Sequence, residues 1–286
     1  MITKKQIIVE TSGLLSLKGL VEVYEEIAAG RMQKIRGAVL QSRQFLEGLL
    51  DVFKRVKAAY LRINTIGISS RPKNGRTLAV FVSANSGLYG EIVDRIFDKF
   101  SDFVRGNNPD VVILGKLGVK MMAERLPGKF YNYYDFSDDG VDQGSFEMIM
   151  RYLVQFEKIL VFYGRFKTIL NQDPVMTSVS GDAILVQEGV TVGEEEKDIV
   201  KNYIFEPTVE DVARVFEGQI SASIFEQTLH ESQLAKFASR MLALDRSVEN
   251  IEKRLQKIDL EKVRLRHRSM NRKQLNTFSG VSLWSG

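Results

Sequence analysis

The chain has 286 residues, 44% of them hydrophobic, so it can bury a sizeable core in one or two domains. It has no cysteine and only two histidines, which excludes disulfides and a zinc site built from Cys and His. The net charge of +4 is mildly basic, and no apolar run approaches the roughly 18 residues that cross a bilayer. Because Met1–Gln6 lacks the apolar centre of a secretion signal, we expect a cytosolic location.

Residues from about 8 to 64 are predicted to form one long helix, because apolar side chains recur at spacings of mostly three, four or seven. A glycine in a helix interior costs up to about 1 kcal/mol, so this helix needs a partner to be stable. Glycines stand at positions 13, 19, 30, 37 and 48. We expect the small side chains of Ala28-Ala29-Gly30 to let a second helix approach closely.

Residues from about 76 to 206 change to short β-rich runs that alternate with amphipathic segments, a rhythm typical of βαβ units. The expected strands and helices follow in chain order: strand 77–83, helix 91–105, strand 110–114, helix 116–125, strand 129–134, helix 146–156 and strand 158–163, the last running on towards Ser178. This order predicts a Rossmann-like α/β domain.

From Thr208 onward the chain returns to helix. Glu210 and Asp211 lie in the expected first turn, where carboxylates favour the positive end of the helix dipole. Gln219–Ser279 contains neither glycine nor proline, and as a continuous helix it would be about 90 Å long, too long for a compact domain of this size. An apolar stripe follows it: Ile220, Ile224, Phe237, Met241, Leu244, Val248, Ile251, Leu255 and Ile258.

The two terminal helices, residues 1–65 and 208–286, are expected to pair with each other. Each has one apolar stripe, and neither has another obvious partner in the chain. The predicted fold is therefore an antiparallel two-helix coiled coil, formed by the N- and C-terminal helices, plus a central α/β domain at residues 76–206. The coiled coil is expected to protrude from that domain.

Two loops resemble ligand sites only in part. Ser83–Gly90 follows a strand and precedes a helix, but its spacing is neither G-x-G-x-x-G nor that of a P-loop, so we expect a tight connection without a ligand. Asp135–Asp142 lacks the ligand register of a calcium loop, so we expect a solvated turn. His230 and His267 have no nearby ligand partners and are expected at a surface or an interface. No catalytic residue, cofactor or metal ligand is predicted.

The most informative polar feature is a basic run near the C-terminus. It contains no acidic residue and six basic ones: Lys262, Arg264, Arg266, Arg268, Arg272 and Lys273. Arg264, Arg266 and Arg268 lie two positions apart, about 200° of helical rotation each time, so they ring the helix. We call these three the arginine collar. A collar suits a partner that surrounds the helix, whereas a helix that reads a nucleic-acid groove would concentrate its charge on one side.

Several segments, in chain order, resemble the gamma subunit of F-type ATP synthases. Leu229–Asn250 is similar to that family's L-x-E-S…A-x-R-M-x-A-M-x-x-A-x-x-N-A signature. Ser83–Gly90 resembles its S-D-R-G-L-C-G loop, Gly115–Gly118 its G-x-K-G turn, and Ile204–Pro207 its Y-x-Y-E-P entry to the long helix. Each motif is short, but the resemblance covers nearly the whole chain in one order, which makes it specific.

The resemblance continues towards the C-terminus, with some departures. Arg266 stands where the family has the arginine of its K-A-R-Q segment, and Ser279-Gly280 where it has a small-residue pair. Tyr24 replaces a methionine of the family's first helix, Glu22 a lysine, and His267 a glutamine. These departures concern contacts with a surrounding ring and leave open a specialised motor that is not used for ATP synthesis.

The resemblance implies a non-catalytic central rotor shaft. Such a shaft couples rotation to nucleotide turnover at alpha/beta subunit interfaces and to ion flow through the membrane rotor. The implied partners are the alpha and beta subunits of the hexameric head, an epsilon-type subunit and the c-subunit ring, at the cytoplasmic face of the cell membrane as a peripheral protein. An apolar tip, Phe278–Trp284, would sit in a bearing. Expected ring contacts are Tyr24, Arg31, Arg240, Arg254, Arg264, Arg266 and Arg268.

Two other functions stay open from the residues alone. A basic coiled coil that binds nucleic acid would show affinity for generic DNA or RNA that falls steeply with salt. A nucleotide-binding enzyme built on the α/β domain would bind ATP tightly, which calorimetry on the isolated chain would detect.

Overall fold

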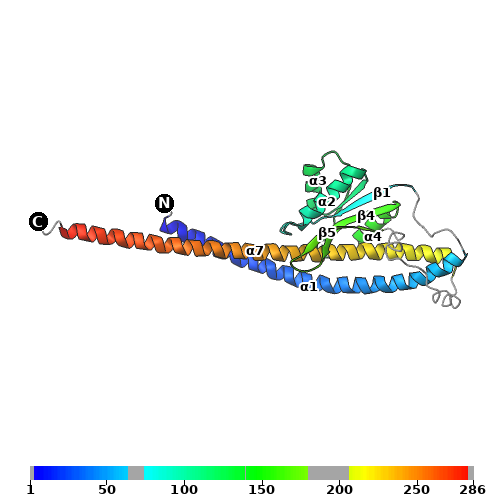
Figure 1. Ribbon diagram of the computed structural model, residues 1–286, viewed down its shortest axis with the longest axis horizontal. Coiled ribbons are helices and arrows are strands. Elements are labelled where there is room, and N and C mark those ends of the chain that lie inside the picture. Colours follow the sequence, from blue (N-terminus) through cyan, green and yellow to red (C-terminus); the bar gives the residue numbers. More distant parts are fainter. Residues whose placement is uncertain (1–2, 64–73, 139, 180–205, 283–286) are drawn as a thin grey trace. The chain divides into compact units, whose positions relative to one another are not determined.

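The computed structural model describes residues 3–63, 74–138, 140–179 and 206–282 (Figure 1). Its elements in chain order are α1 (Lys4–Ile63), β1 (Thr77–Val82), α2 (Ile92–Asn107), β2 (Asp110–Leu114), α3 (Lys116–Arg125), β3 (Asn132–Tyr134), α4 (Gln143–Leu153), β4 (Lys158–Phe166), β5 (Gln172–Ser178) and α7 (Val209–Ser282). The chain divides into two compact units, residues 28–240 and residues 1–27 with 241–286. Both long helices, α1 and α7, contribute to each unit.

The five strands form one sheet in the order β3-β2-β1-β4-β5. β1 pairs in parallel with β2 and with β4, β2 pairs in parallel with β3, and β5 is antiparallel to β4. The expectation of one strand running on from 158 towards Ser178 is wrong, because the chain reverses at 167–171. Backbone bonds close that turn, with the amide of Asn171 donating to the carbonyl of Thr168 at 3.2 Å. The predicted parallel α/β domain is otherwise confirmed.

Alternate residues of the strands face two separate apolar clusters, because successive side chains of a strand point to opposite faces. The strand residues of the first cluster, which α2 and α3 cover, are Ala79, Phe81, Val111, Ile113, Leu160 and Phe162. Those of the second, which α4 covers, are Leu78, Val80, Val82, Val112, Leu114, Ile159, Val161 and Tyr163. Both clusters also take side chains from α1 and α7, so the long helices are part of this unit's core.

The helices between the strands lie close to their predicted positions. α4 begins three residues before the expected start, because the Asp142 carboxylate accepts a hydrogen bond from the backbone N–H of Ser145 at 2.9 Å and caps the helix. Gly115, directly before α3, has φ +98°, and a Cβ there would lie 2.8 Å from the backbone of Ala84. The expected Gly115–Gly118 turn therefore brings the loops after β1 and β2 together.

In the unit made of residues 1–27 and 241–286, α1 and α7 pack side by side and antiparallel (Figure 1). Their apolar seam consists of Leu14, Val21, Leu244, Val248, Ile251 and Leu255. Ion pairs flank the seam: Arg254 Nη2 lies 2.6 Å from Glu10 Oε1, and Lys18 Nζ lies 2.6 Å from Glu252 Oε1. The predicted pairing of the terminal helices is confirmed here.

Two details of the helix predictions are wrong. Ile220, Ile224 and Phe237, expected in a seam of two helices alone, pack in clusters that contain side chains of α1 and also of the sheet. Gly30 is not a point of close approach, because a Cβ there would meet no described atom within 4 Å, although neighbouring Ala28 is buried. Ile204, Phe205 and the end of the tip, 283–286, lie outside the described residues. None of the described helices is long and apolar enough to span a membrane.

Candidate functional site

Within the unit of residues 28–240, the part of α7 from Ile220 to Ser239 is buried or half-buried on every side. This surface is unusually polar for a helix enclosed in a core. Its buried polar side chains are Ser221, Ser223, Thr228, Glu231, Ser232, Gln233, Lys236 and Ser239. The charged groups among them identify the places where the helix is fixed to the rest of the unit.

Lys236 is the most buried of these charges. Its ammonium group donates to the backbone carbonyl of Ser83 at 2.8 Å and lies 3.1 Å from Asp138 Oδ1. Burial lowers the pKa of Lys236, and Asp138 acts in the opposite direction by favouring the charged form. Burial by itself would raise the pKa of Asp138, but Lys236 and backbone hydrogen bonds hold that pKa below its usual value. The pair ties α7 to the end of β1.

Asp138 also fills the loop after β1. Its Oδ2 accepts hydrogen bonds from the backbone N–H groups of Asn85 and Ser86 at 2.9 and 3.0 Å, and from the Ser86 hydroxyl at 3.2 Å. Successive N–H groups after a β-strand are the usual cradle for phosphate. In this chain an internal carboxylate occupies that cradle. The expectation of a solvated turn at Asp135–Asp142 is therefore wrong for Asp138, which is 8% exposed.

Arg240, the last residue of α7 in this unit, also contacts the loop after β1. Its Nη2 donates to the Ser86 hydroxyl at 3.0 Å and to the carbonyl of Gly87 at 2.6 Å. Its guanidinium lies 4.0 Å from the centroid of the Tyr89 ring, and burial raises the pKa of that tyrosine to about 12. Ser239 adds a hydrogen bond of 2.8 Å to the carbonyl of Tyr89.

These contacts place α7 where many α/β proteins bind a ligand. Open α/β sheets bind ligands outside the carboxyl ends of their strands, at the point where the strand order reverses. β1 has β2 on one side and β4 on the other, so the order reverses beside β1. Lys236 contacts Ser83, the first residue after β1. The α/β domain thus holds a segment of its own chain in the position of a ligand.

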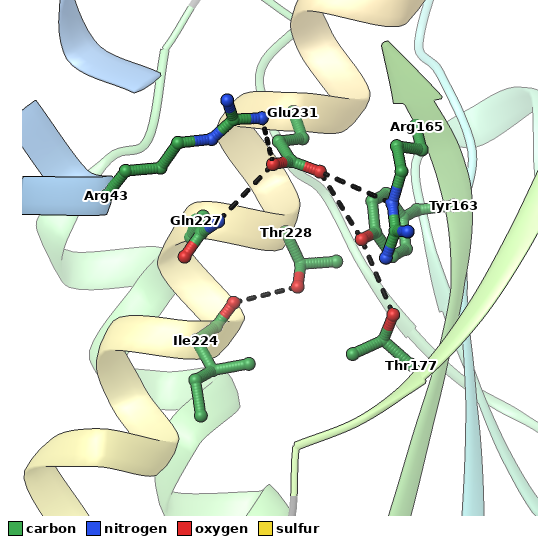
Figure 2. Close-up of a pocket in the computed structure, with 8 residues that line it drawn as sticks. All are labelled: Arg43, Tyr163, Arg165, Thr177, Ile224, Gln227, Thr228 and Glu231. Carbon is green, nitrogen blue, oxygen red and sulfur yellow. Dashed lines mark hydrogen bonds and ion pairs between the residues drawn. The ribbon is translucent and has the colours of Figure 1, made fainter. Parts of the chain in front are cut away.

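A second junction surrounds Glu231 and lines a cavity of about 370 Å³ (Figure 2). Arg43 of α1 donates to Glu231 Oε1 at 2.6 Å, and Gln227 donates to the same oxygen at 3.3 Å. The other oxygen, Oε2, accepts from the Tyr163 hydroxyl at 3.4 Å and lies 4.0 Å from Nε of Arg165. Burial raises the pKa of Tyr163, which keeps its hydroxyl protonated as a donor. One carboxylate therefore joins α1, α7 and β4.

The unit of residues 1–27 and 241–286 has a different surface. Its helices expose large apolar side chains along α1 and along the last part of α7. On α1 these are Ile8, Val9, Leu15, Leu17, Leu20, Val23, Tyr24 and Ile27, and on α7 they are Leu260, Val263, Met270, Leu275 and Phe278. Such a surface is suited to burial against a partner.

The arginine collar lies on this surface. From Lys262 to Phe278 every side chain is exposed except Leu265, which is half-buried, so α7 is a single exposed helix in this part of the described chain. The collar arginines are all exposed, with Arg264 and Arg268 one turn apart on one side of the helix and Arg266 on the other, and Tyr24 of α1 is 45% exposed. These side chains are therefore accessible at the surface of this unit.

The other predicted contact residues have partners inside the chain. Arg254 pairs with Glu10, and Arg240 holds the loop after β1. The guanidinium of Arg31 lies 5.9 Å from the centroid of the Phe237 ring. His230 lies inside the unit of residues 28–240 with its Nε2 3.7 Å from Glu226, whereas His267 is exposed.

Sequence reasoning did not single out Asp138, Lys236 or Glu231. The available signal was the position of Glu231 and Lys236: two charged residues in a stretch of α7 where apolar and small side chains occupy nearly every turn. Charged side chains at such positions are almost never fully buried without a partner.

Comparison with known proteins gives consistent results. A family model described as "ATP synthase" matches residues 6–280. An ATP synthase gamma chain of Desulforamulus reducens is 25% identical over 280 residues, covering 93% of this chain and 94% of the relative. One of Cytophaga hutchinsonii is 22% identical over 281 residues, covering 93% of each chain.

Solved structures support the fold. A chain from the central stalk and c-ring of the Tetrahymena thermophila mitochondrial ATP synthase has a TM-score of 0.59 at 16% identity, covering 80% of this chain and 99% of that one. A chain of the Euglena gracilis mitochondrial ATP synthase has a TM-score of 0.53 at 12% identity, covering 91% and 94%.

Proposed function

Because the chain belongs to the gamma-chain family of F-type ATP synthases, we propose that it is the central rotor shaft of a rotary ATP synthase or ATPase. The observation that carries the proposal is the exposed surface of residues 1–27 and 241–286, with its apolar side chains and its arginine collar. Such a surface is costly on a solvated protein and is suited to a partner that encloses it.

The proposed mechanism depends on asymmetry. An asymmetric shaft inside a threefold ring of alternating alpha and beta subunits touches each interface differently, so each interface takes a different conformation. Turning the shaft changes the three conformations in sequence. The shaft itself performs no ATP chemistry, and nucleotide turns over at the alpha/beta interfaces.

We expect the collar arginines to pair with carboxylates of the ring, since such charge-assisted hydrogen bonds are the strong ones, and Tyr24 to contact the ring from α1. Arg31, Arg240 and Arg254 would reach the ring by sharing or exchanging the partners that they have within the chain. The α/β domain would contact the c-subunit ring and an epsilon-type subunit at the cytoplasmic face of the membrane.

Charge reversal of the collar tests the proposal. The variant R264E/R266E/R268E should assemble with alpha and beta subunits poorly or give a complex that is stalled or uncoupled, while its α/β domain stays folded. ATP turnover and rotation of the assembled complex are the measurements, with far-UV circular dichroism of the chain beside them.

The matched control is Arg214→Glu, a charge reversal at an exposed arginine near the start of the same helix. It should leave turnover unchanged. If the collar variant turns over ATP and rotates like the wild type, the collar has no part in the mechanism.

The exposed basic run from Lys262 to Lys273 is also the specific feature that favours nucleic-acid binding as a second candidate function. Titration of the full chain with a generic DNA duplex at about 50 and 200 mM salt separates the two. Tight binding that persists when alpha and beta subunits are present would favour the second function over the shaft.

A further inference from the structure

Glu231 is a single buried carboxylate with partners on two sides of α7. Its side chain is 6% exposed, while the arginines that face it, Arg43 and Arg165, are each about half exposed. Figure 2 shows Arg43 approaching from α1 on one side of the carboxylate, and Arg165 with Tyr163 approaching from β4 on the other. Each oxygen of the carboxylate is directed to one of these sides.

Elsewhere in this unit α7 is held at the loop after β1 by Lys236 and Arg240, and by large buried side chains such as Phe225, so Glu231 shares the resistance to turning with them. Thr228 and Ser232, one turn before and directly after Glu231, are small, and the hydroxyl of Thr228 is bonded to the carbonyl of Ile224 in its own helix at 2.7 Å. Small side chains interlock less deeply than large ones, so close packing resists turning less at this position than it does at Phe225 or Phe237. Charge-assisted hydrogen bonds, by contrast, depend on direction and distance.

We propose that Glu231 is a positioning residue that helps to prevent α7 from turning about its own axis inside the α/β domain, and so transmits torque between that domain and the helix. The inference rests on the proposed shaft function. Turning α7 one way moves the carboxylate away from Arg43, and turning it the other way moves it away from Tyr163 and Arg165. The junction therefore resists rotation in both directions.

The first test uses Glu231→Gln in the complete membrane complex, where the side chain keeps its size and loses its charge. The matched control is Glu226→Gln, a half-exposed carboxylate five residues earlier on the same helix. We expect ATP hydrolysis to continue while ions moved per ATP fall under load. Losing one charge-assisted hydrogen bond should raise the fraction of slipped turnovers about tenfold.

The second test separates the two sides of the junction. In single-molecule experiments, a bead attached to the α/β domain of the assembled complex is turned by an external torque in either direction. Arg43→Ala and Arg165→Ala should slip preferentially in opposite directions. A merely structural role would lower the thermal midpoint of each variant without any difference between directions.

The outcomes distinguish the inference from the function on which it rests. If the wild-type chain does not assemble with alpha and beta subunits, the proposed function fails. If the wild type assembles and rotates, but Glu231→Gln slips no more than Glu226→Gln at equal occupancy, the inference about Glu231 is wrong. Equal slip of Arg43→Ala and Arg165→Ala in both directions would also overturn it.

Discussion

Two segments of α7 have similar helical periodicity and opposite surroundings. From Ile220 to Ser239 the helix is enclosed, and its buried charged groups, Glu231 and Lys236, are each matched to a partner inside the chain. From Lys262 to Phe278 the helix is exposed, and its charges are all basic in the stretch that ends at Lys273. The same helix is therefore fixed to the α/β domain in the first segment and exposes its side chains in the second.

The difference shows that the function of a charge on this helix depends on burial. A buried charge must be compensated, so it fixes the helix in one position, and removing its partner is costly. An exposed charge is solvated and contributes little to folding, so it is available for a partner. We expect substitutions in the enclosed segment to change stability and substitutions in the exposed segment to change assembly.

Breaking the Lys236–Asp138 pair should have the largest effect. Lys236→Met leaves the Asp138 carboxylate buried without its counter-charge, so the free energy of unfolding should fall by about 3–5 kcal/mol in urea titrations of the full chain. Lys253→Met, at an exposed lysine of the same helix, is the control and should change it little. Similar losses in both variants would contradict the distinction between the two kinds of charge.

The acid limb of the stability profile should report on Asp138. Its pKa is lowered in the folded chain, so its carboxylate stabilises the fold above the pKa of about 4 that it has when unfolded, and this contribution is lost as the pH falls below that value. Asp138→Asn should therefore be less stable than the wild type near neutral pH by about 1–3 kcal/mol, with the difference narrowing below about pH 4.

Unfolding free energies from pH 3 to 7 measure this change. Asp259→Asn, at an exposed site on α7, should follow the wild-type profile. A constant gap between Asp138→Asn and the wild type over the whole range would show that the charge of Asp138 is not what stabilises the fold.

Replacing a glycine by alanine should lower stability where the glycine is closely packed and raise it where the glycine faces open space. A Cβ at Gly164 would lie 3.1 Å from Ile92 and 3.3 Å from Ala235, so Gly164→Ala should destabilise the chain by about 1–3 kcal/mol. A Cβ at Gly48 of α1 would meet no described atom within 4 Å, so Gly48→Ala should stabilise it by up to about 1 kcal/mol. Thermal unfolding of both variants measures the contrast, and a gain at Gly164 would show that α7 does not pack closely on β4.

The smallest effect is expected at the ion pairs that flank the exposed seam. Lys18→Ala, Glu252→Ala and the double variant form a cycle that measures the coupling of the two side chains. Both are largely solvated, so the coupling should be small and should disappear at about 1 M salt. If the coupling free energy did not change with salt, the Lys18–Glu252 pair would behave like the buried ion pairs, which contradicts this prediction.

The sequence by itself determined most of the secondary structure and the fold class, since both follow from short-range patterns. Apolar spacing of three and four residues predicted α1 and α7, and β-rich runs between helices predicted the parallel strands. The pattern could not show the reversal at 167–171 or the division of the α7 stripe between the seam and the sheet clusters, because both depend on what packs against those residues.

Only the tertiary structure decided which charges act together. Lys236 and Asp138 are 98 residues apart in the chain, and Arg43 and Glu231 are 188 apart. No local spacing connects such residues. On an exposed helix the same charged side chains would be solvated and would need no partner. The collar could be read from the sequence because an exposed charge needs no partner within the chain, whereas a buried charge acquires its role only when folding brings its counter-charge within a few ångströms.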